Sequence, residues 1–444
     1  MKAKCKFNSV GQGMFYSTQL FSNYNRQFNF VYDCGFDLKH TISKCSKCKN
    51  PQAIDKSIDD FKLIANNKIN LLAISHFDND HISHIPKLIK NMRLNTVMLP
   101  FVAKEVRFLL ALYKCKEINS DDIYSDDLLE LYSKPIQYFA KHGAKKIIIL
   151  HGEDNDEENY DEEDYGDNIN PIVPINNWDK EEDEAILIYN ESEEYDELDI
   201  KKPELLKEYT YGNIHIEHWK GAPDFILYEY NWIFTPFNLS EKYDENIIKD
   251  IEGEVGKILR KYDYNWHGTL SKIKEAQKEF KNIYKFEGKI NETSLFIKSR
   301  PSMTAIIDYD YPMYNFPCNN LGKLNCLHCR KYDYHNRNDF IPITLLTGDI
   351  TLDEKAISEL RNNHMWNGYE TVLQLPHHGS RNNINISILH DLRNPACLVA
   401  SYGLKNTYRH PAPELIEDIF YKTCHRFIGV NENKNFTYTI CDQN

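Results

Sequence analysis

Short apolar runs alternate with amphipathic segments along this chain of 444 residues. Apolar runs of about four to eight residues bounded by turn residues predict buried strands, whereas apolar positions three or four residues apart predict helices. The alternation of the two predicts an α/β protein built in layers. The expected strands are 28–33, 69–74, 95–100, 145–150, 290–297, 343–349, 372–378 and 397–403, with a β region at 214–238. The expected helices are 51–67, 83–92, 103–118, 126–141, 240–260 and 269–286.

The strand 69–74 leads into the densest group of metal-capable side chains. His76, Asp78, Asp80 and His81 fall within six residues on a predicted strand-to-helix loop, which can wrap around a cation. Imidazole together with carboxylate suits zinc, manganese or iron. Two groups of two ligands indicate a dinuclear site. The alternative is a polar loop in which Asp80 only caps the next helix, but capping requires neither histidine.

Three strands in the second half also end in polar residues that could reach such a site. They lead into Gly348-Asp349, into His377-His378-Gly379, and into a loop that ends at His410. Open α/β sheets build their sites at the carboxyl ends of strands. Each of these signals is weak alone, since Gly-Asp is more often a turn, but together with the first loop they form a strong pattern.

These motifs together resemble the metallo-β-lactamase fold. The loop at 76–81 is similar to its His-x-His-x-Asp-His signature, with Asp78 where the second His usually stands. Val-Gly-Gln-Gly at 10–13, Tyr-Asp-Cys-Gly at 32–35 and the later motifs, in the same order, resemble the metallo-β-lactamase domain of the DNA-uptake competence channel, although Arg409 replaces the glycine of the last motif. The resemblance covers residues 7 to about 413, except 100–290 and 311–340. It implies an α/β, four-layer αββα sandwich with large insertions.

The resemblance also implies a role for each candidate residue. His76 and Asp78 would hold one divalent ion, Asp80 and His81 a second, and Asp349 would bridge them. One of His377 and His378 would bind a metal ion and the other would contact the substrate. Asp33 would orient the metal ligands without binding metal itself. The metal ligands implied are His76, Asp78, Asp80, His81, Asp349, His377 and His410, and the catalytic residues are Asp80, His377 and His378.

The identity of the metals and one ligand stay open. The carboxylate of Asp78 adds a negatively charged oxygen ligand, which is a hard ligand in place of an imidazole. This moves the expectation from zinc alone towards manganese. The family usually places a third histidine ligand of the first metal before the Thr-Gly-Asp strand. Here Asn291 occupies the nearest motif, His267 is a rival, and one of the His377/His378 pair could also complete the site.

The cysteines indicate a reducing compartment and a second kind of metal site. Eleven cysteines without a regular framework are typical of cytosolic proteins, and no apolar signal segment or run of about 18 apolar residues is present. We therefore expect a cytoplasmic protein without membrane contact. Two Cys-x-x-Cys pairs could close a structural zinc site through Cys45, Cys48, Cys326 and Cys329, or they could be unrelated surface cysteines.

Charge is distributed unevenly. Residues 153–199 contain 21 acidic residues and one basic residue, so this segment has a net charge of −20. Because the whole chain has a net charge of −13, the rest of the chain has a net charge of +7. A basic body favours nucleic acid as a partner. The acidic segment is either a solvated insertion or an arm that binds a protein partner or mimics DNA over a basic groove.

The sequence as a whole predicts one interrupted domain with a hydrolytic site. Residues 1–100 and 291–444, the latter with a cysteine-containing loop at 311–340, would form its halves, and 101–290 an elaboration on its rim. Two cations roughly 3.5–4 Å apart can generate hydroxide and clamp a phosphoryl group. We therefore expect a phosphodiesterase with two zinc or manganese ions, most simply a nuclease on DNA or RNA. The alternatives are hydrolysis of a small substrate such as a cyclic nucleotide, and a regulatory protein that keeps the fold without turnover.

Overall fold

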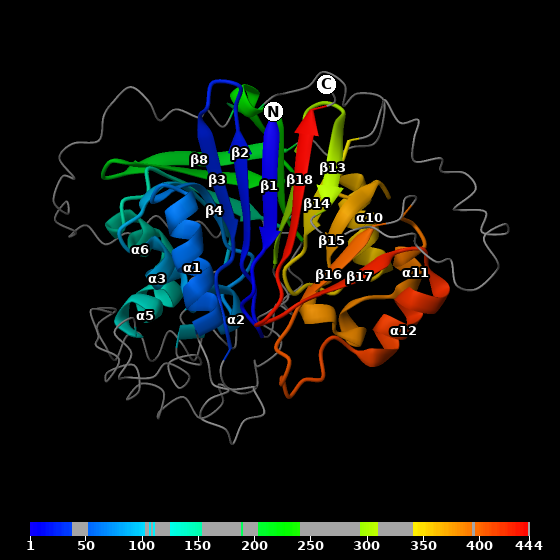
Figure 1. The fold of residues 1–444 in the computed structure, drawn as a ribbon. Coiled ribbons are helices and arrows are strands. Elements are labelled where there is room, and N and C mark those ends of the chain that lie inside the picture. The colour runs from blue at the N-terminus through cyan, green and yellow to red at the C-terminus, as the bar shows by residue number, and fades with distance from the viewer. Residues whose placement is uncertain are drawn as a thin grey trace.

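Two large mixed sheets and several helices make up the part of the chain that the structure describes (Figure 1). The structure is a computed structural model, and it describes residues 1–37, 52–102, 106–107, 110–111, 125–152, 188–189, 203–239, 294–309, 341–392 and 396–442. The expected α/β class is therefore confirmed.

The first sheet has ten strands in the order β13-β18-β1-β2-β3-β4-β5-β6-β9-β8. Its centre, from β3 to β9, is parallel, and its two ends are antiparallel. Strand β4 is buried along almost its whole length, as a parallel strand covered on both faces should be. The strands are β1 (Lys2–Phe7), β2 (Tyr16–Phe21), β3 (Gln27–Tyr32), β4 (Lys68–Ala73), β5 (Arg93–Pro100), β6 (Lys146–His151), β8 (Glu204–Tyr211), β9 (Ile214–Lys220), β13 (Ala305–Tyr309) and β18 (Phe436–Asp442).

The second sheet has eight strands in the order β17-β16-β15-β14-β12-β11-β10-β7. Strands β14 to β17 are parallel, whereas β12, β11, β10 and β7 join antiparallel. The strands are β7 (Ile188–Tyr189), β10 (Phe225–Leu227), β11 (Trp232–Asn238), β12 (Leu295–Pro301), β14 (Ile343–Leu346), β15 (Glu370–Gln374), β16 (Cys397–Ser401) and β17 (Arg426–Val430).

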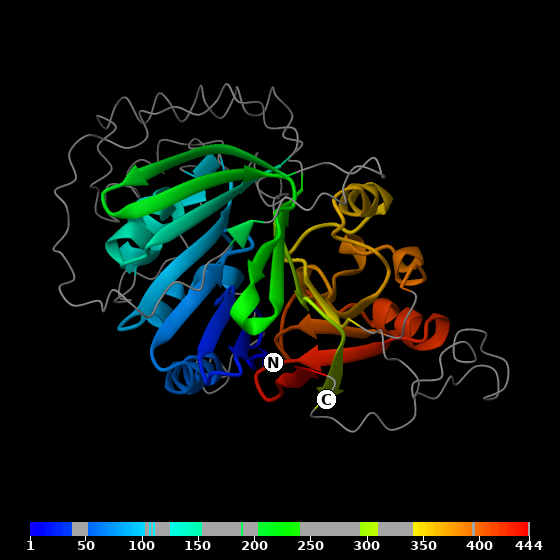
Figure 2. The same ribbon diagram turned by 90° about the horizontal axis from the view of Figure 1, so that it is seen from above.

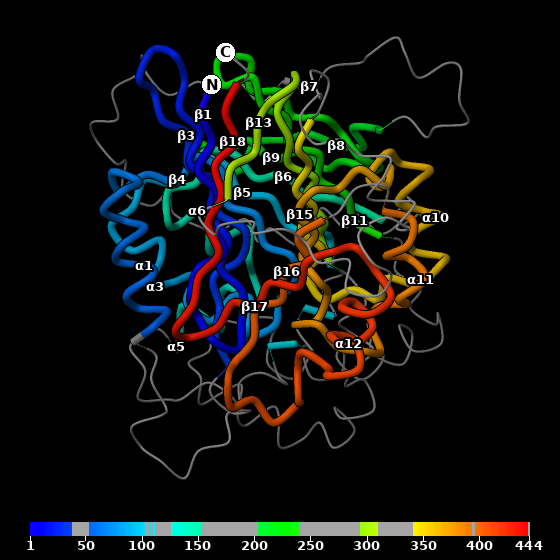
Figure 3. The backbone as a smooth tube through the Cα atoms, turned by 45° about the vertical axis from the view of Figure 1, so that its right-hand side comes forward, coloured from blue at the N-terminus to red at the C-terminus, as the bar shows by residue number. Residues whose placement is uncertain are grey.

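One apolar cluster fills the space between the sheets. It contains Leu71 of β4 and Leu346 of β14, so the two strands that lead into the candidate site share one core. Seen from above, the sheets face each other along this core (Figure 2). The tube view shows the first and last strands, β1 and β18, running side by side, as their pairing requires (Figure 3).

Helices cover the outer face of each sheet. In α1, Ile54, Ile58 and Phe61 form the apolar stripe of an amphipathic helix and pack towards the first sheet. A separate cluster joins the second sheet to α10, α11 and α12. The helices are α1 (Gln52–Ile64), α2 (Asn79–Ile82), α3 (Ile85–Ile89), α5 (Ser125–Ser133), α6 (Pro135–Lys141), α10 (Glu354–Asn362), α11 (Ile386–Leu389) and α12 (Pro413–Lys422), with short 3₁₀ turns η5 (Tyr228–Tyr230), η7 (His377–Gly379) and η8 (Arg381–Asn383).

The expected helix 83–92 is shorter in the structure, where only α3 (Ile85–Ile89) lies within it and a separate helical turn, α2, precedes it. Helix α2 begins at Asn79 and ends at Ile82, and α3 begins at Ile85. Pro86 lies in the first turn of α3, where its missing N–H costs nothing, but it cannot continue a helix from α2. The amide of His84 donates instead to the carbonyl of Cys34 at 3.0 Å. The metal-capable loop is thereby tied to the end of β3.

The segment 101–290 supplies strands to both sheets. Strands β6, β8 and β9 extend the first sheet, and β7, β10 and β11 extend the second. Its described part is therefore continuous with the architecture expected of residues 1–100 and 291–444. The expected helices 240–260 and 269–286 and most of 103–118 lie outside the described residues. No helix among the described residues combines the length and apolar character needed to cross a membrane.

Candidate metal centre

Residues from both sheets converge at one buried group. The loop after β4 brings His76, Asp78, Asp80 and His81, while the loop after β14 brings Asp349. The turn after β15 adds a histidine pair, because η7 holds His377 and His378 in left-handed backbone conformations. Four of these side chains have potential ligand atoms within 4.8 Å of one another, and such a group can hold a metal ion: Asp80, His81, Asp349 and His378.

The two oxygens of Asp349 face different partners, a first set that contains His81 alone and a second set that contains His76 and His377. Its Oδ1 atom is 3.1 Å from Nε2 of His81. Its Oδ2 atom is 3.7 Å from Nε2 of His76 and 3.4 Å from Nδ1 of His377. Since each oxygen of this carboxylate faces a different set, Asp349 has the position that a bridging ligand needs. Asp78 joins the second set, with Oδ2 3.9 Å from Nε2 of His76.

The buried histidines are held through their Nδ1 atoms. Nδ1 of His81 donates to Oδ2 of Asp33 at 2.7 Å, and Nδ1 of His378 donates to the carbonyl of Ser401 at 2.7 Å. Nδ1 of His76 lies 2.9 Å from the hydroxyl of Ser75. Engaging Nδ1 fixes the tautomer and leaves Nε2 directed into the group, as metal-binding histidines require.

Several buried atoms of this group have no hydrogen-bond partner among the described residues. They are Nε2 of His76, together with Nε2 of His81 and Oδ1 of Asp349, which form an ion pair at 3.1 Å without the alignment of a hydrogen bond. A buried polar atom left unpaired is costly, so such atoms normally have a partner. Imidazole nitrogens and carboxylate oxygens clustered in this way form a donor set that fits zinc or manganese. The residues present therefore fit the divalent metal that the sequence predicts.

Opposite charges compensate each other around Asp349. Burial lowers the pKa of His81, but the nearby carboxylates of Asp349 and Asp33 outweigh burial and raise that pKa well above its usual value. Burial raises the pKa of Asp349, but the positive charge of His81 outweighs it and brings the pKa well below the usual range. Asp349 is therefore an ionised carboxylate, and a metal ion bound here would displace the proton from Nε2 of His81 and take over its positive charge.

A second compensated pair lies beside the first. Nε2 of His378 is 2.9 Å from Oδ2 of Asp80. Burial opposes charge on both groups, but this hydrogen bond lowers the pKa of Asp80 and raises that of His378. His76 differs, because burial and the charge of His81 both lower its pKa, which keeps its imidazole neutral and able to ligate.

Glycines allow the supporting loops to approach the metal-capable loop. A Cβ atom at Gly35 would lie 2.3 Å from the backbone nitrogen of His81 and 2.4 Å from the backbone carbon of Asp80. The amide of the neighbouring Cys34 donates to the carbonyl of His81 at 2.8 Å. Gly348, with φ of +60°, brings Asp349 into place where a side chain would meet Ser294. The glycine motifs at 10–13 and 32–35 thus serve packing around the site.

His410 lies at the rim of the group. Its ring is 5.6 Å from that of His377 and stacks on the ring of Tyr408, with centroids 5.7 Å apart. Burial, followed by the charges of His378 and His377, lowers the pKa of His410 to about 4, so its imidazole is neutral. Its Nδ1 atom is buried without a hydrogen-bond partner among the described residues, which leaves it able to ligate.

Sequence reasoning missed three serines that support the site. The amide and hydroxyl of Ser75 both donate to Asp33 at 2.7 Å. Ser294 accepts from the amide of Asp349 at 3.2 Å and lies 3.3 Å from Nδ1 of His76. Ser401 acts through its backbone carbonyl, which no side-chain motif can signal. Of the remaining candidates, Cys45, Cys48, Cys326, Cys329, His267 and Asn291 lie outside the described residues.

No model of a known protein family matches this chain, and no match is found among curated proteins.

Proposed function

We propose that this chain is a metal-dependent phosphodiesterase with the four-layer αββα fold of the metallo-β-lactamase hydrolases. Two facing sheets with helices outside them are compatible with that fold. The observation that carries the proposal is the position of Asp349, whose Oδ1 faces His81 while its Oδ2 faces His76 and His377. A bridged pair of divalent ions is the arrangement that hydrolyses phosphodiesters by in-line displacement.

In this proposal the chain holds two ions, zinc or manganese. Asp80, His81 and His378 would hold one, His76 and Asp78 would hold the other, Asp349 would contact both, and His410 would be a further ligand at the rim. Bound divalent ions lower the pKa of a water and offset charge on phosphoryl oxygens. The carboxylate of Asp80, which belongs to the group, would hold such a water in place by hydrogen bonding.

The two adjacent histidines, His377 and His378, have different roles in this proposal. The side chain of His378 is 4% exposed and belongs to the four-residue group, whereas that of His377 is 39% exposed. We assign the ligand role to His378 and the substrate role to His377, which reverses the preference for His377 as ligand at the sequence level. An exposed imidazole beside the group can donate a proton to the leaving oxygen.

Nucleic acid is the substrate that we propose. The body outside residues 153–199 carries +7, which favours a polyanion. The ring of Tyr408, 44% exposed and parallel to that of His410, offers a face on which a base can stack beside the site. A partner for the acidic segment and a cytoplasmic location remain part of the same proposal.

An activity screen tests this function. Protein stripped of metal is assayed on single-stranded DNA, double-stranded DNA, RNA and cyclic dinucleotides, with manganese, zinc and magnesium added in turn. We expect cleavage of a nucleic acid with manganese or zinc. Preferential cleavage of cyclic dinucleotides would favour the small-substrate alternative. Stoichiometric metal binding without cleavage of any of the four substrates would contradict the phosphodiesterase proposal and favour a regulatory protein.

A further inference from the structure

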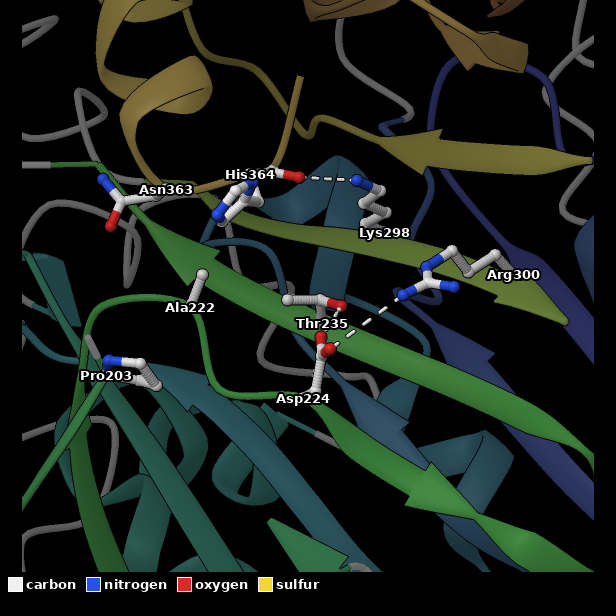
Figure 4. Close-up of a pocket in the computed structure, with 8 residues that line it drawn as sticks. All are labelled: Pro203, Ala222, Asp224, Thr235, Lys298, Arg300, Asn363 and His364. Carbon is white, nitrogen blue, oxygen red and sulfur yellow. Dashed lines mark hydrogen bonds and ion pairs between the residues drawn. The ribbon is translucent and has the colours of Figure 1, made fainter. Parts of the chain in front are cut away.

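A small pocket opens on the second sheet, and none of the residues that line it belongs to the metal centre (Figure 4). Strand β12 supplies Lys298 and Arg300, which lie two residues apart and therefore project from the same face of the sheet. Phe296, two residues earlier, packs with α10 in the outer apolar cluster, so this is the helix-covered face. In Figure 4 both cationic head groups point into the space between His364 and Asp224.

Lys298 is a buried cation with spare donors. Its residue is 6% exposed, and Nζ donates to the carbonyl of His364 at 2.5 Å. An ammonium has three N–H groups, and this carbonyl is its one hydrogen-bond acceptor among the described residues. Burial lowers the pKa of Lys298 to about 8, against the opposing effect of Glu370. With this pKa most Lys298 side chains are protonated at neutral pH, and no anion of the described residues forms a hydrogen bond with the ammonium.

Arg300 is positioned by a carboxylate but not saturated by it. Its guanidinium lies 4.0 Å from Oδ2 of Asp224, which is an ion pair too long for a hydrogen bond. Asp224 in turn accepts a hydrogen bond from the hydroxyl of Thr235. A guanidinium presents five N–H groups in a planar fork, so most of its donors are available to a ligand.

The charges around the pocket favour an anion. Lys298 and Arg300 face the single carboxylate of Asp224, and burial lowers the pKa of His364, which keeps that imidazole neutral. Glu370 acts on the charge of Lys298 but does not line the pocket. The lining therefore carries one uncompensated positive charge.

We propose that this pocket binds the phosphate group of a phosphate monoester. A phosphate accepts from an arginine fork and from a lysine ammonium at once, and its charge compensates the two cations better than a neutral ligand can. The cavity volume of about 40 Å³ holds roughly three water molecules, which matches the oxygens of one head group rather than a whole nucleotide. The rest of the ligand lies outside the pocket.

Calorimetric titration of the full-length protein tests this site. Inorganic phosphate is titrated into wild type, Arg300→Gln and Lys298→Met, and into Lys355→Gln as a control that removes an exposed cation from α10. Phosphate bound at the metal centre contributes equally to all four proteins. We expect both pocket variants to weaken the binding attributed to the pocket at least tenfold, and Lys355→Gln to leave it within about twofold of wild type.

A second arm identifies the source of the phosphate. Thymidine 5′-monophosphate and thymidine are titrated into the same four proteins. Tighter binding of the monophosphate than of inorganic phosphate, lost in Arg300→Gln, identifies a phosphorylated nucleotide or strand end. The reverse order identifies free phosphate.

Equal phosphate affinity in wild type and Arg300→Gln would overturn the proposal. If Lys298→Met fails to fold, the partly exposed Arg300→Gln decides the outcome alone. The result is independent of hydrolysis at the metal centre, since no step of the titration requires turnover.

Discussion

Nδ1 of His81 lies 2.7 Å from Oδ2 of Asp33, and both side chains are fully buried. Asp33 directly follows β3 and has a positive φ, and His81 belongs to α2, so this contact fixes the metal-capable loop to the first sheet. The same carboxylate accepts from the amide and hydroxyl of Ser75. Through Asp33, the sheet thus sets the direction of Nε2 of His81.

Replacing this carboxylate by an amide should weaken metal binding. In Asp33→Asn one acceptor oxygen becomes an NH₂ donor, so the side chain can no longer accept from both Nδ1 of His81 and the amide of Ser75. We expect metal affinity to fall about 10- to 100-fold. Competition with a chelator measures it, and Asp308→Asn, at an exposed position, is the matched control. Unchanged affinity in Asp33→Asn would show that His81 does not depend on this contact.

The close approach at Gly35 gives a second prediction. An added methyl group would overlap the backbone of Asp80 and His81, so Gly35→Ala must displace the metal-capable loop. We expect a loss of about 1–3 kcal/mol in the free energy of unfolding, with reduced metal content. Gly212 has a positive φ but open space around it, so Gly212→Ala should cost about 1–2 kcal/mol and keep the metal. Equal metal content in both variants would count against this role of Gly35.

The histidine pair should separate metal binding from chemistry. His378→Ala removes a buried member of the four-residue group and should lower metal content. His377→Ala removes the more exposed ring and should retain most of the metal while hydrolysis slows by ~10²–10⁴-fold. Metal analysis and turnover are measured on the same preparations. The opposite pattern would restore His377 as the ligand.

A buried histidine pair away from the site predicts how stability depends on pH. Nε2 of His151 is 2.8 Å from Nδ1 of His218, and burial lowers their pKa values to about 2 and about 4, from the usual 6.5. Between pH 6.5 and 4 the unfolded chain therefore binds more protons than the folded protein. The free energy of unfolding should fall as the pH falls through this window, by up to about 1.4 kcal/mol per pH unit for each histidine.

Removing one imidazole should flatten this dependence. In His218→Gln the slope between pH 6.5 and 4.5 should decrease by up to about 1.4 kcal/mol per pH unit, as measured by urea unfolding at several pH values. His390→Gln, at an exposed position, is the control and should keep the wild-type slope. A wild-type slope in His218→Gln would mean that this pair does not set the acid sensitivity.

The ligands could be predicted from the sequence because their residue types signal their chemistry. His76 to His81 stand in one loop, and Asp349 and His377 each follow an apolar strand, so pattern and residue type pointed to the same places. The pairing of Asp349 with both sets depends on how two sheets face each other, and strand periodicity does not encode that. Ser75 and Ser294 escaped notice because a serine hydroxyl carries no distinctive signal outside its three-dimensional context.

The order of the strands within the two sheets could not be predicted from the sequence either. The apolar runs at 145–150 and 214–238 predicted β structure, but not that β6 and β9 would join the first sheet while β11 joins the second. Long-range pairing is decided by the burial of whole faces rather than by local preference. The break between α2 and α3 was also missed, since one helix was expected over 83–92 in spite of Pro86, and the contact between His84 and Cys34 shows how the chain uses it.

The measurement that tests the central claim most directly is the metal content and turnover of Asp349→Ala beside wild type. Asp349 faces both sets of histidines, so its loss should disturb both metal positions. We predict two divalent ions per chain and phosphodiester cleavage in wild type, with fewer ions and no detectable cleavage in Asp349→Ala. An Asp349→Ala protein that kept its full metal content and full activity would contradict the account.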